Sequence, residues 1–426
     1  MATPLTAAHR AWRVKVFAST YLSYVAFYFC RKPWSAAKNS LLEAHPTWTQ
    51  TDVGNVYAAY LLAYSIGQFV ASGMGTKLGP RKNVLLGMGL SLLATLAMGL
   101  DFDLSTLGGL MVVNGLAQAT GWSGNVGTMA SWFHKHERGR VMGAWATNFN
   151  IGSLVAGWAM AGVLDVTGWQ GTFFVGAIVM AIVWVAFFVM QRNKPQDVGL
   201  APIDDPVTAV DEATEPDPPP TGFLGLDRNQ WTNLLLVAGF YFFIKFIRYA
   251  IWSWAPYFLE THYACSAGTA NWLATAFDFL GLPGVFLTGY LSDTRFGSRR
   301  AGISALFMIG VTIATAVMWL SIAAGVAVFV VVLAAVGFFA YGPDALLTGA
   351  GAMDIGGRRA ATFAAAVISG FGSVGSIVQE LVIARVYDPK TGDLSIVFLL
   401  LLGSAALATC FCGALVWRNR SGGRGI

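Results

Sequence analysis

The sequence predicts an all-α membrane protein with twelve transmembrane helices in two pseudo-symmetric six-helix bundles. Composition is the first reason: 55% of the 426 residues are hydrophobic and 12% are charged, whereas roughly a quarter of the residues in a soluble domain are charged. The second reason is that polar breaks divide the apolar sequence into twelve runs, each close to the roughly 20 residues that span a bilayer. The third is a long acidic, proline-rich break after the sixth run.

The twelve runs alternate with short polar loops along the whole chain. In order they are 12–36, 52–73, 83–100, 104–133, 139–164, 169–190, 231–259, 266–291, 301–323, 326–352, 360–386 and 394–417. The first run is longer than the apolar core of a secretion signal and leads into further runs, so we expect it to be retained as a membrane helix.

Lysines and arginines indicate the orientation. Twenty of the 27 lie at the termini or in the loops after even-numbered runs. Cytoplasmic loops are enriched in these cations, so we expect both termini in the cytoplasm. The same dispersal between apolar runs argues against nucleic-acid binding.

Residues 191–228 are expected to be a cytoplasmic acidic, proline-rich linker between an N-terminal bundle (1–190) and a C-terminal bundle with a short tail (229–426). The segment 191–229 holds seven of the fifteen prolines and eight of the 22 acids, with "PDPPP" at its centre. Such a sequence buries too little apolar surface to fold. The basic loops "GMGTKLGPRK" and "GYLSDTRFGSRR", six runs apart, indicate a duplicated bundle, and paired repeats are typical of secondary transporters.

Five cations lie inside or at the edge of apolar runs: Arg385 in the eleventh run, and four that form two pairs. Arg31 and Lys32 belong to the first run, and Lys245 and Arg248 to the seventh. A charge at the bilayer centre costs about 3 kcal/mol on insertion scales and usually faces a cavity or a partner. For Arg31, snorkelling to the interface is the alternative, but the continuation "PWSAAKNSLL" predicts a helix that extends beyond it.

Three acids are available to balance these cations or to couple transport to protons: Asp278, Asp344 and Glu380. A structural salt bridge from the seventh run to Asp278 or Asp344 is one interpretation. The other is an anion site, because the cations outnumber the acids in reach. Arginine favours a phosphate or carboxylate ligand, which a guanidinium binds with two parallel hydrogen bonds. Polar and aromatic residues expected to orient such a ligand are Tyr24, Tyr28, Tyr64, Gln68, Trp122, Asn148, Asn150 and Tyr341.

Eight motifs lie in order along nearly the whole chain: "FYFCRKPWS", "AYSIGQF", "ATGWSGN", "SWFHKHERG", "NKPQDVGLAPI", "FIRYAIWSWAPYFL", "GLPGVFLTGYLSD" and "YGPDALL". Together they resemble the organophosphate:phosphate antiporters of the major facilitator superfamily. The resemblance implies the major facilitator fold, with Arg31 and Arg248 as the two phosphate-binding arginines. It implies that Lys32 matches the lysine after the first arginine, and that Tyr24, Tyr28, Tyr64 and Trp122 line the cavity.

Three positions depart from the glycerol-3-phosphate transporters of this family. Gln68 stands where they have a lysine, Phe149 where they have a histidine, and Lys245 where they have an uncharged aromatic residue. A cation moved from the second run to the seventh predicts an altered fit for the organic part of the substrate.

We therefore expect a monomeric transporter of the bacterial inner (plasma) membrane that exchanges a phosphorylated metabolite for inorganic phosphate by alternating access. The metabolite class is a sugar phosphate, glycerol phosphate or phosphoglycerate. A proton-coupled organic-anion symporter and a membrane sugar-phosphate receptor are the alternatives. No cofactor, metal or catalytic motif is predicted, and an enzyme is not expected.

Overall fold

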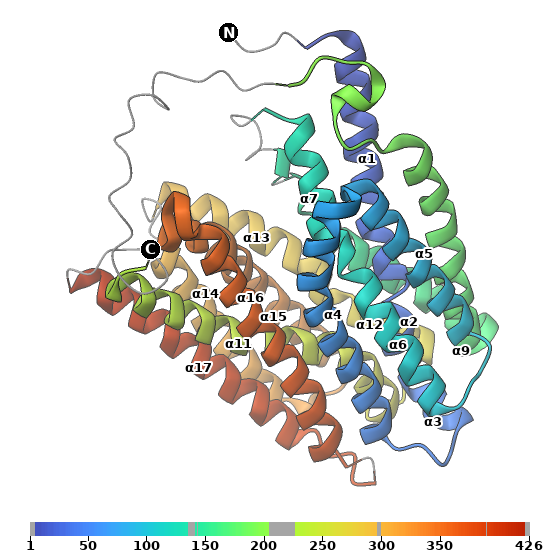
Figure 1. Ribbon diagram of the computed structural model, residues 1–426. Helices are drawn as coiled ribbons and strands as arrows, with labels where there is room; N and C mark the ends of the chain where they lie inside the picture. Colours follow the sequence, from blue (N-terminus) through green and yellow to red (C-terminus); the bar gives the residue numbers. More distant parts are fainter. Residues whose placement is uncertain are drawn as a thin grey trace. The chain divides into compact units, whose positions relative to one another are not determined.

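The protein is built from α-helices, as predicted (Figure 1). The computed structural model describes residues 5–134, 141–142, 144–203, 226–295, 300–388 and 390–421. These residues group into two compact units, Met1–Leu41 with Ala59–Asp217, and Leu42–Ala58 with Pro218–Ile426. The first unit thus holds most of the first half of the chain, while the start of its fourth helix belongs to the second unit.

The first half of the chain contains eight described α-helices. They are α1 (Ala7–Phe29), α2 (Lys32–Ala36), α3 (Lys38–Ala44), α4 (Gln50–Leu78), α5 (Pro80–Met98), α6 (Leu104–Gln118), α7 (Thr120–Trp132) and α9 (Asn148–Met190). Helix α9 covers the fifth and sixth predicted runs, which are joined at Gly168. This glycine has φ 71° and ψ −175°, a conformation outside the helical region, so the helix axis breaks there.

The second half contains seven α-helices and one π-helix among the described residues. They are α11 (Arg228–Thr261), α12 (Ala267–Ala274), α13 (Ala276–Thr294), α14 (Arg300–Leu320), α15 (Val326–Ala345), the π-helix η3 (Leu346–Gly351), α16 (Ala352–Val386) and α17 (Ser395–Arg420). Every one of the twelve predicted runs overlaps helix in the described residues.

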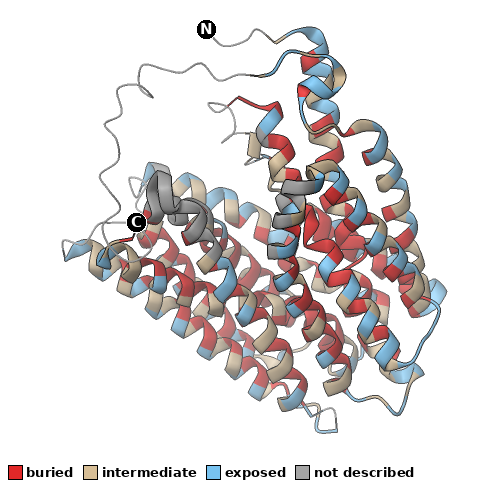
Figure 2. Cartoon of the chain, viewed as in Figure 1, coloured by how far each residue is buried: buried red, intermediate tan, exposed pale blue. Residues whose placement is uncertain are grey.

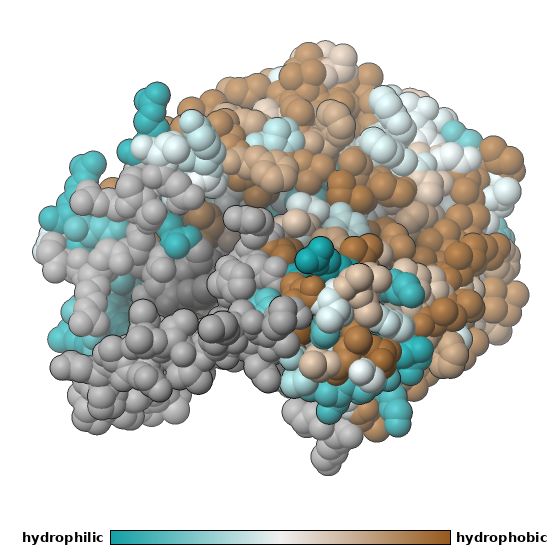
Figure 3. Space-filling model, turned by 90° about the horizontal axis from the view of Figure 1, so that it is seen from above, coloured by the Kyte–Doolittle hydropathy of each residue, from teal (hydrophilic) through white to brown (hydrophobic). Residues whose placement is uncertain are grey.

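Apolar side chains cover much of the described surface. Seven described segments are long and apolar enough to cross a membrane: Asn148–Met190, Arg228–Thr261, Ala267–Ser292, Arg300–Leu320, Val326–Thr348, Val367–Val386 and Ser395–Arg420. In Figure 2, buried residues lie where helices face one another, and in Figure 3 hydrophobic residues dominate the described surface. Val331 is 69% exposed and Leu320 76%, which suits lipid contact.

The first predicted run does not form one helix through residue 36. Helix α1 ends at Phe29, Cys30 caps it, and Arg31 is the N-cap of α2. Pro33 explains the break, because a proline cannot donate to the carbonyl four residues earlier and its ring clashes with that carbonyl. The chain does continue beyond Arg31 in helical turns, but from a joint between two helices.

Glycines allow close contact between helices in both units. An added Cβ at Gly281 on α13 would lie 2.4 Å from the ring of Tyr341 on α15. In the first unit, a Cβ at Gly152 on α9 would lie 2.8 Å from the ring of Tyr28 on α1. Small residues at such crossings let membrane helices approach closely, and here they place aromatic rings against neighbouring helices.

The predicted linker is structured at its start. Pro195–Val198 forms a 3-10 turn, in which the Asp197 carboxylate accepts the backbone N–H of Asn193 at 3.0 Å. The ring Nε2 of His9 lies 3.0 Å from the Ala201 carbonyl oxygen. Val198 and Leu200 pack against a core around Trp132, so the first residues of the predicted linker contact the helices of the first unit. The centre of the linker, with "PDPPP", lies outside the described residues, as does part of the second basic loop.

Candidate functional site

Arg31 lies in the first unit, at the joint between α1 and α2. It is 7% exposed, and its backbone N–H donates to the Tyr28 carbonyl oxygen at 3.1 Å. Its guanidinium carbon lies 4.9 Å from the ring centre of Tyr28 and 5.0 Å from that of Tyr64. These are cation–π distances, so predicted residues from the first and second runs do surround this arginine.

A glutamine holds the Arg31 side chain in place. Arg31 Nε donates to the Gln118 side-chain oxygen at 3.1 Å, and the Tyr60 hydroxyl donates to the same oxygen at 2.9 Å. Gln118 is the last residue of α6 and is 1% exposed. The partner that this structure gives to Arg31 Nε is therefore a neutral amide.

The amide of Gln118 is itself fixed by a buried polar network. Its Nε2 donates to Asn114 Oδ1 at 3.0 Å, and the Ser91 hydroxyl donates to the same Asn114 oxygen at 2.7 Å. Asn114 in turn donates to the Cys30 carbonyl oxygen at 2.9 Å. The network thus connects α6 and α5 to the end of α1 and returns to the residue before Arg31. Such a network fixes side-chain geometry when its members are satisfied.

An aromatic cluster lies next to this arginine. The ring centres of Tyr24 and Tyr28 are 6.0 Å apart, and the ring of Tyr24 lies 5.4 Å from that of Trp122 and 6.0 Å from that of Trp145. Trp122 is 39% exposed, whereas Tyr24 is 7% exposed. The predicted residues Tyr24, Tyr28 and Trp122 are therefore together, and sequence reasoning missed Trp145.

The remaining predicted residues of the first unit are less closely tied to Arg31. Lys32 opens α2 and is half-buried, and Gln68 lies one helical turn after Tyr64 on α4, also half-buried. Asn150 is 3% exposed and its side-chain oxygen has no hydrogen-bond partner among the described residues. Both polar side-chain atoms of Asn148 are likewise buried and have no hydrogen-bond partner among the described residues.

Arg248 lies within α11 in the second unit and pairs with an acid. Its Nη1 is 2.6 Å from Asp344 Oδ2, and both side chains are 7% exposed. The guanidinium carbon also lies 4.4 Å from the ring centre of Tyr341 and 4.9 Å from that of Trp252. The sequence left two interpretations of these charges open, and the salt bridge to Asp344 is present in this structure.

Asp278 holds the aromatic walls around Arg248. The indole N–H of Trp252 donates to Asp278 Oδ1 at 2.8 Å, and the Tyr341 hydroxyl donates to the same oxygen. Asp278 is 1% exposed and belongs to the first turn of α13. Because both donors also stack on the Arg248 guanidinium, this carboxylate positions that arginine's surroundings.

Lys245 lies one turn before Arg248 on α11, between two tyrosines. Its Nζ is 5.1 Å from the ring centre of Tyr241 and 5.2 Å from that of Tyr249. Tyr241 and Tyr249 were not predicted, although their spacing of four residues on either side of Lys245 indicates a shared helix face. Gln118 and Trp252 were also missed; each is a polar group within an apolar run, which is a usable signal.

Glu380 makes a different set of contacts. It is fully buried on α16 and accepts hydrogen bonds from Trp254 Nε1 and from Gln379 Nε2, both at 3.1 Å.

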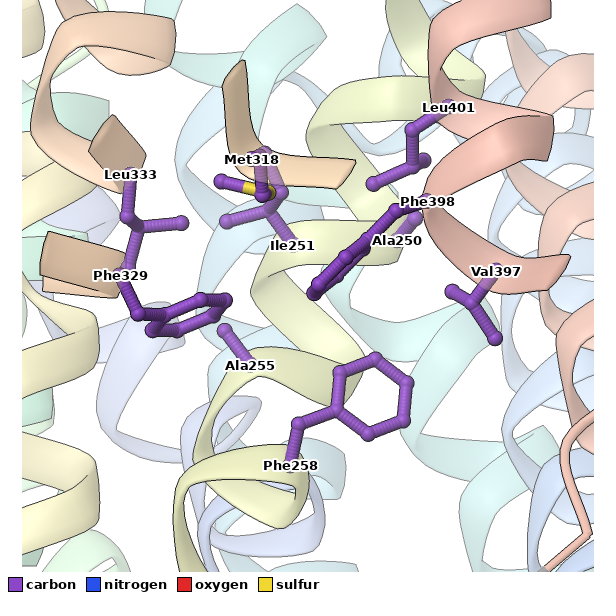
Figure 4. Close-up of a pocket in the computed structure, with 10 residues that line it drawn as sticks. All are labelled: Ala250, Ile251, Ala255, Phe258, Met318, Phe329, Leu333, Val397, Phe398 and Leu401. Carbon is purple, nitrogen blue, oxygen red and sulfur yellow. The ribbon is translucent and has the colours of Figure 1, made fainter. Parts of the chain in front are cut away.

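A small cavity in the second unit is lined by apolar residues. All ten of them, from α11, α14, α15 and α17, are hydrophobic (Figure 4). It offers no polar group to an anion.

The chain is similar to known proteins over most of its length. The family model for the Major Facilitator Superfamily matches residues 16–379. A glycerol-3-phosphate transporter of Bacillus subtilis (strain 168) is 30% identical over 97% of this chain and 94% of its own. A probable hexose phosphate transport protein of Chlamydia pneumoniae is 28% identical over 89% and 86%. The membrane sensor protein UhpC of Escherichia coli (strain K12) is 25% identical over 90% and 88%.

Solved structures share the fold. The crystal structure of a D-xylose-proton symporter superimposes with a TM-score of 0.74 over 94% of this chain and 97% of that one, at 14% identity. A bacterial homologue of the human lysosomal transporter Spinster gives 0.72 at 14% identity. The predicted fold class and the resemblance to organophosphate transporters are thereby confirmed.

Proposed function

Because the chain belongs to the Major Facilitator Superfamily, we propose that it is a secondary active transporter that exchanges a phosphorylated metabolite for inorganic phosphate. The observation that carries the proposal is a buried arginine in each unit, Arg31 and Arg248, each lying against aromatic rings. Relatives named as glycerol-3-phosphate and hexose phosphate transporters support a substrate of the same class.

The two arginines bind the phosphoryl group in this proposal. A guanidinium keeps its charge at every physiological pH and matches two phosphate oxygens at once. Lys32 and Lys245 add positive charge, and Tyr24, Tyr64 and Trp122 contact the organic part of the metabolite. Lys245 lies between two tyrosines and supplies a further cation. The family resemblance implies an uncharged aromatic residue at this position in glycerol-3-phosphate transporters.

Exchange follows from electrostatics. An empty site would hold more cations than carboxylates, because Asp344 pairs with Arg248 while Arg31, Lys32 and Lys245 add further positive charge. In a medium of low dielectric constant this surplus opposes closure of the transporter until an anion neutralises it. Two bundles, 1–190 and 229–426, then rock about a central site and open to each side of the membrane in turn. We propose a monomer in the bacterial inner membrane with both termini in the cytoplasm, as the lysine and arginine distribution indicates.

Reconstituted vesicles test the exchange. Uptake of labelled phosphate into proteoliposomes should require inorganic phosphate or glycerol 3-phosphate inside the vesicles. Equal uptake into empty vesicles would contradict obligatory exchange. Uptake into empty vesicles that appears only with an imposed pH gradient would instead identify a proton-coupled anion symporter, in which Asp278, Asp344 or Glu380 carries the proton.

A sugar-phosphate receptor is the second candidate. The similarity to the membrane sensor protein UhpC supports it. Transport and binding distinguish the two: a receptor binds glucose 6-phosphate or glycerol 3-phosphate in detergent but shows no counterflow of either in vesicles. Counterflow against a panel of glycerol, hexose and glycerate phosphates would also identify the metabolite. We propose no catalytic reaction for either candidate.

A further inference from the structure

Arg248 has a carboxylate where a phosphate oxygen would bind. The Nη1–Oδ2 distance to Asp344 is 2.6 Å, and both side chains are almost fully buried. Trp252 and Tyr341 lie against the guanidinium at 4.9 and 4.4 Å. The carboxylate therefore binds an N–H of a guanidinium that lies against two aromatic rings, at the distance of a strong charge-assisted hydrogen bond.

Carboxylate and phosphate compete for such a group. Each accepts the N–H of a guanidinium with a negatively charged oxygen, and one N–H cannot make a full hydrogen bond to both. Two anions close together in a buried site also repel each other strongly. Phosphate can therefore accept hydrogen bonds from all the N–H groups of Arg248, Nη1 included, only when the Asp344 carboxylate moves away.

We propose that Asp344 is an internal competitor that sets how tightly Arg248 binds the phosphoryl group of the substrate. The inference deepens the proposed function and rests on it. When a binding-competent state is populated for only a fraction of the time, the apparent affinity falls by that fraction. If the pair is closed nine-tenths of the time, for example, phosphate binds about tenfold more weakly than to an open Arg248.

Weaker binding suits a transporter. A carrier must release its substrate in every cycle, and a dianion held between arginines in a medium of low dielectric constant is released slowly. The Asp344 carboxylate offers Arg248 a replacement ligand at the moment of release, so the guanidinium is never left buried without an anion. That replacement lowers the barrier to release while raising the phosphate concentration needed for half-saturation.

The neighbouring acid has a different role, which provides a matched comparison. Asp278 accepts hydrogen bonds from Trp252 and Tyr341, the two rings that stack on Arg248. Asp278→Asn removes the same charge from the same unit as Asp344→Asn, yet it leaves the Asp344 carboxylate in place. A general change in the electrostatic field would affect both variants alike, whereas competition concerns Asp344 alone.

The experiment measures inorganic phosphate binding to purified protein by titration calorimetry. Asp344→Asn should lower the dissociation constant for phosphate about tenfold. Asp278→Asn should raise it, because the charged acceptor that holds Trp252 and Tyr341 is lost. In proteoliposomes, Asp344→Asn should lower both KM and Vmax for phosphate counterflow, because binding is tighter and release slower. Asp344→Ser, which also removes the carboxylate, should behave in the same way and serves if the asparagine variant is not monodisperse.

Three results separate the possibilities. If Asp344 only supports the fold, its variants lose Vmax with unchanged or weaker phosphate binding, and the inference is overturned. An equal gain in affinity for Asp278→Asn and Asp344→Asn overturns it as well. Wild-type protein that binds no phosphate at all contradicts the proposed function, whereas wild-type binding with no gain in Asp344→Asn contradicts only the competitor.

Discussion

The two arginines of this protein have opposite kinds of partner. In the first unit, Arg31 Nε donates to the neutral amide oxygen of Gln118. In the second unit, Arg248 pairs with the negatively charged Asp344. Both guanidinium groups lie against aromatic rings, so the difference concerns charge and not the overall surroundings.

The comparison shows how a duplicated bundle can divide the work of anion binding. The Gln118 amide orients Arg31 through Nε without contributing a charge of its own. A charged partner cancels the charge of Arg248 until a stronger ligand arrives. Under the proposed function, Asp344 gives the second unit a competitor for the phosphoryl group that the Gln118 amide does not give the first.

Replacing either arginine by lysine should have the largest effect. Arg31→Lys and Arg248→Lys keep the charge but lose the two parallel hydrogen bonds, worth roughly 2 kcal/mol, so we expect at least a roughly 30-fold loss of phosphate counterflow in each. Arg420→Lys, at the exposed end of α17, is the control and should be unchanged. Retained counterflow in either buried variant would remove that arginine from the site.

Gln118→Glu makes the first unit resemble the second. A carboxylate beside Arg31 should compete with phosphate as we propose for Asp344, and weaken phosphate binding about tenfold in calorimetry. Gln196→Glu adds the same charge at an exposed position of the 3-10 turn and should bind phosphate as the wild type does. An unchanged dissociation constant in Gln118→Glu would mean that the partner of Arg31 does not govern anion binding.

Alanine at two interhelical glycines should disturb the aromatic walls to different degrees. Gly281→Ala pushes Tyr341 away from Arg248, and Gly152→Ala pushes Tyr28 away from Arg31; each should cost about 1 to 3 kcal/mol of stability and weaken phosphate binding several-fold. We expect the larger loss for Gly281→Ala, because Tyr341 also donates to Asp278.

A matched substitution checks this interpretation of the glycines. A Cβ at Gly289, further along α13, meets nothing within 4 Å. Gly289→Ala should therefore leave phosphate binding unchanged and raise the midpoint of thermal unfolding slightly, because alanine favours helix. Similar losses of binding at Gly281 and Gly289 would argue against a specific effect on Tyr341.

Removing single hydrogen bonds behind the rings should have the smallest effect on phosphate binding, although it lowers stability. Trp252→Phe loses the donor to the Asp278 carboxylate, and Tyr60→Phe loses the donor to the Gln118 amide. Hydrogen bonds to charged groups contribute about 1.5 to 3 kcal/mol and neutral ones about 1 kcal/mol. We therefore expect a greater loss of thermal stability for Trp252→Phe, and the reverse order would contradict the comparison.

The sequence predicts the helices and the four cations, because both depend on local patterns of apolar residues and on the cost of a charge in a bilayer. It does not predict which acid pairs with Arg248. Asp278 and Asp344 were equal candidates from the sequence. In the packed helices, Asp278 accepts hydrogen bonds from Tyr341 and Trp252, and Asp344 pairs with the Arg248 guanidinium.

Gln118 was missed for a related reason. It belongs to the fourth predicted run, far in sequence from Arg31, and nothing local indicates that its amide oxygen faces the end of α1. Lys245 was predicted as one of the cations. Its contacts with Tyr241 and Tyr249 can be predicted only when the residues on one face of that helix are considered together.

Because Pro33 interrupts the first helix, the backbone around Arg31 differs from that around Arg248. Arg31 lies at a joint, where α1 has ended and α2 has yet to begin, so a small rotation of the short helix can reorient it while the rest of α1 stays still. Arg248 lies thirteen residues before the end of a 34-residue helix and must move with it. The backbone at Arg31 can therefore turn without moving α1, whereas Arg248 changes its orientation only together with the whole of α11.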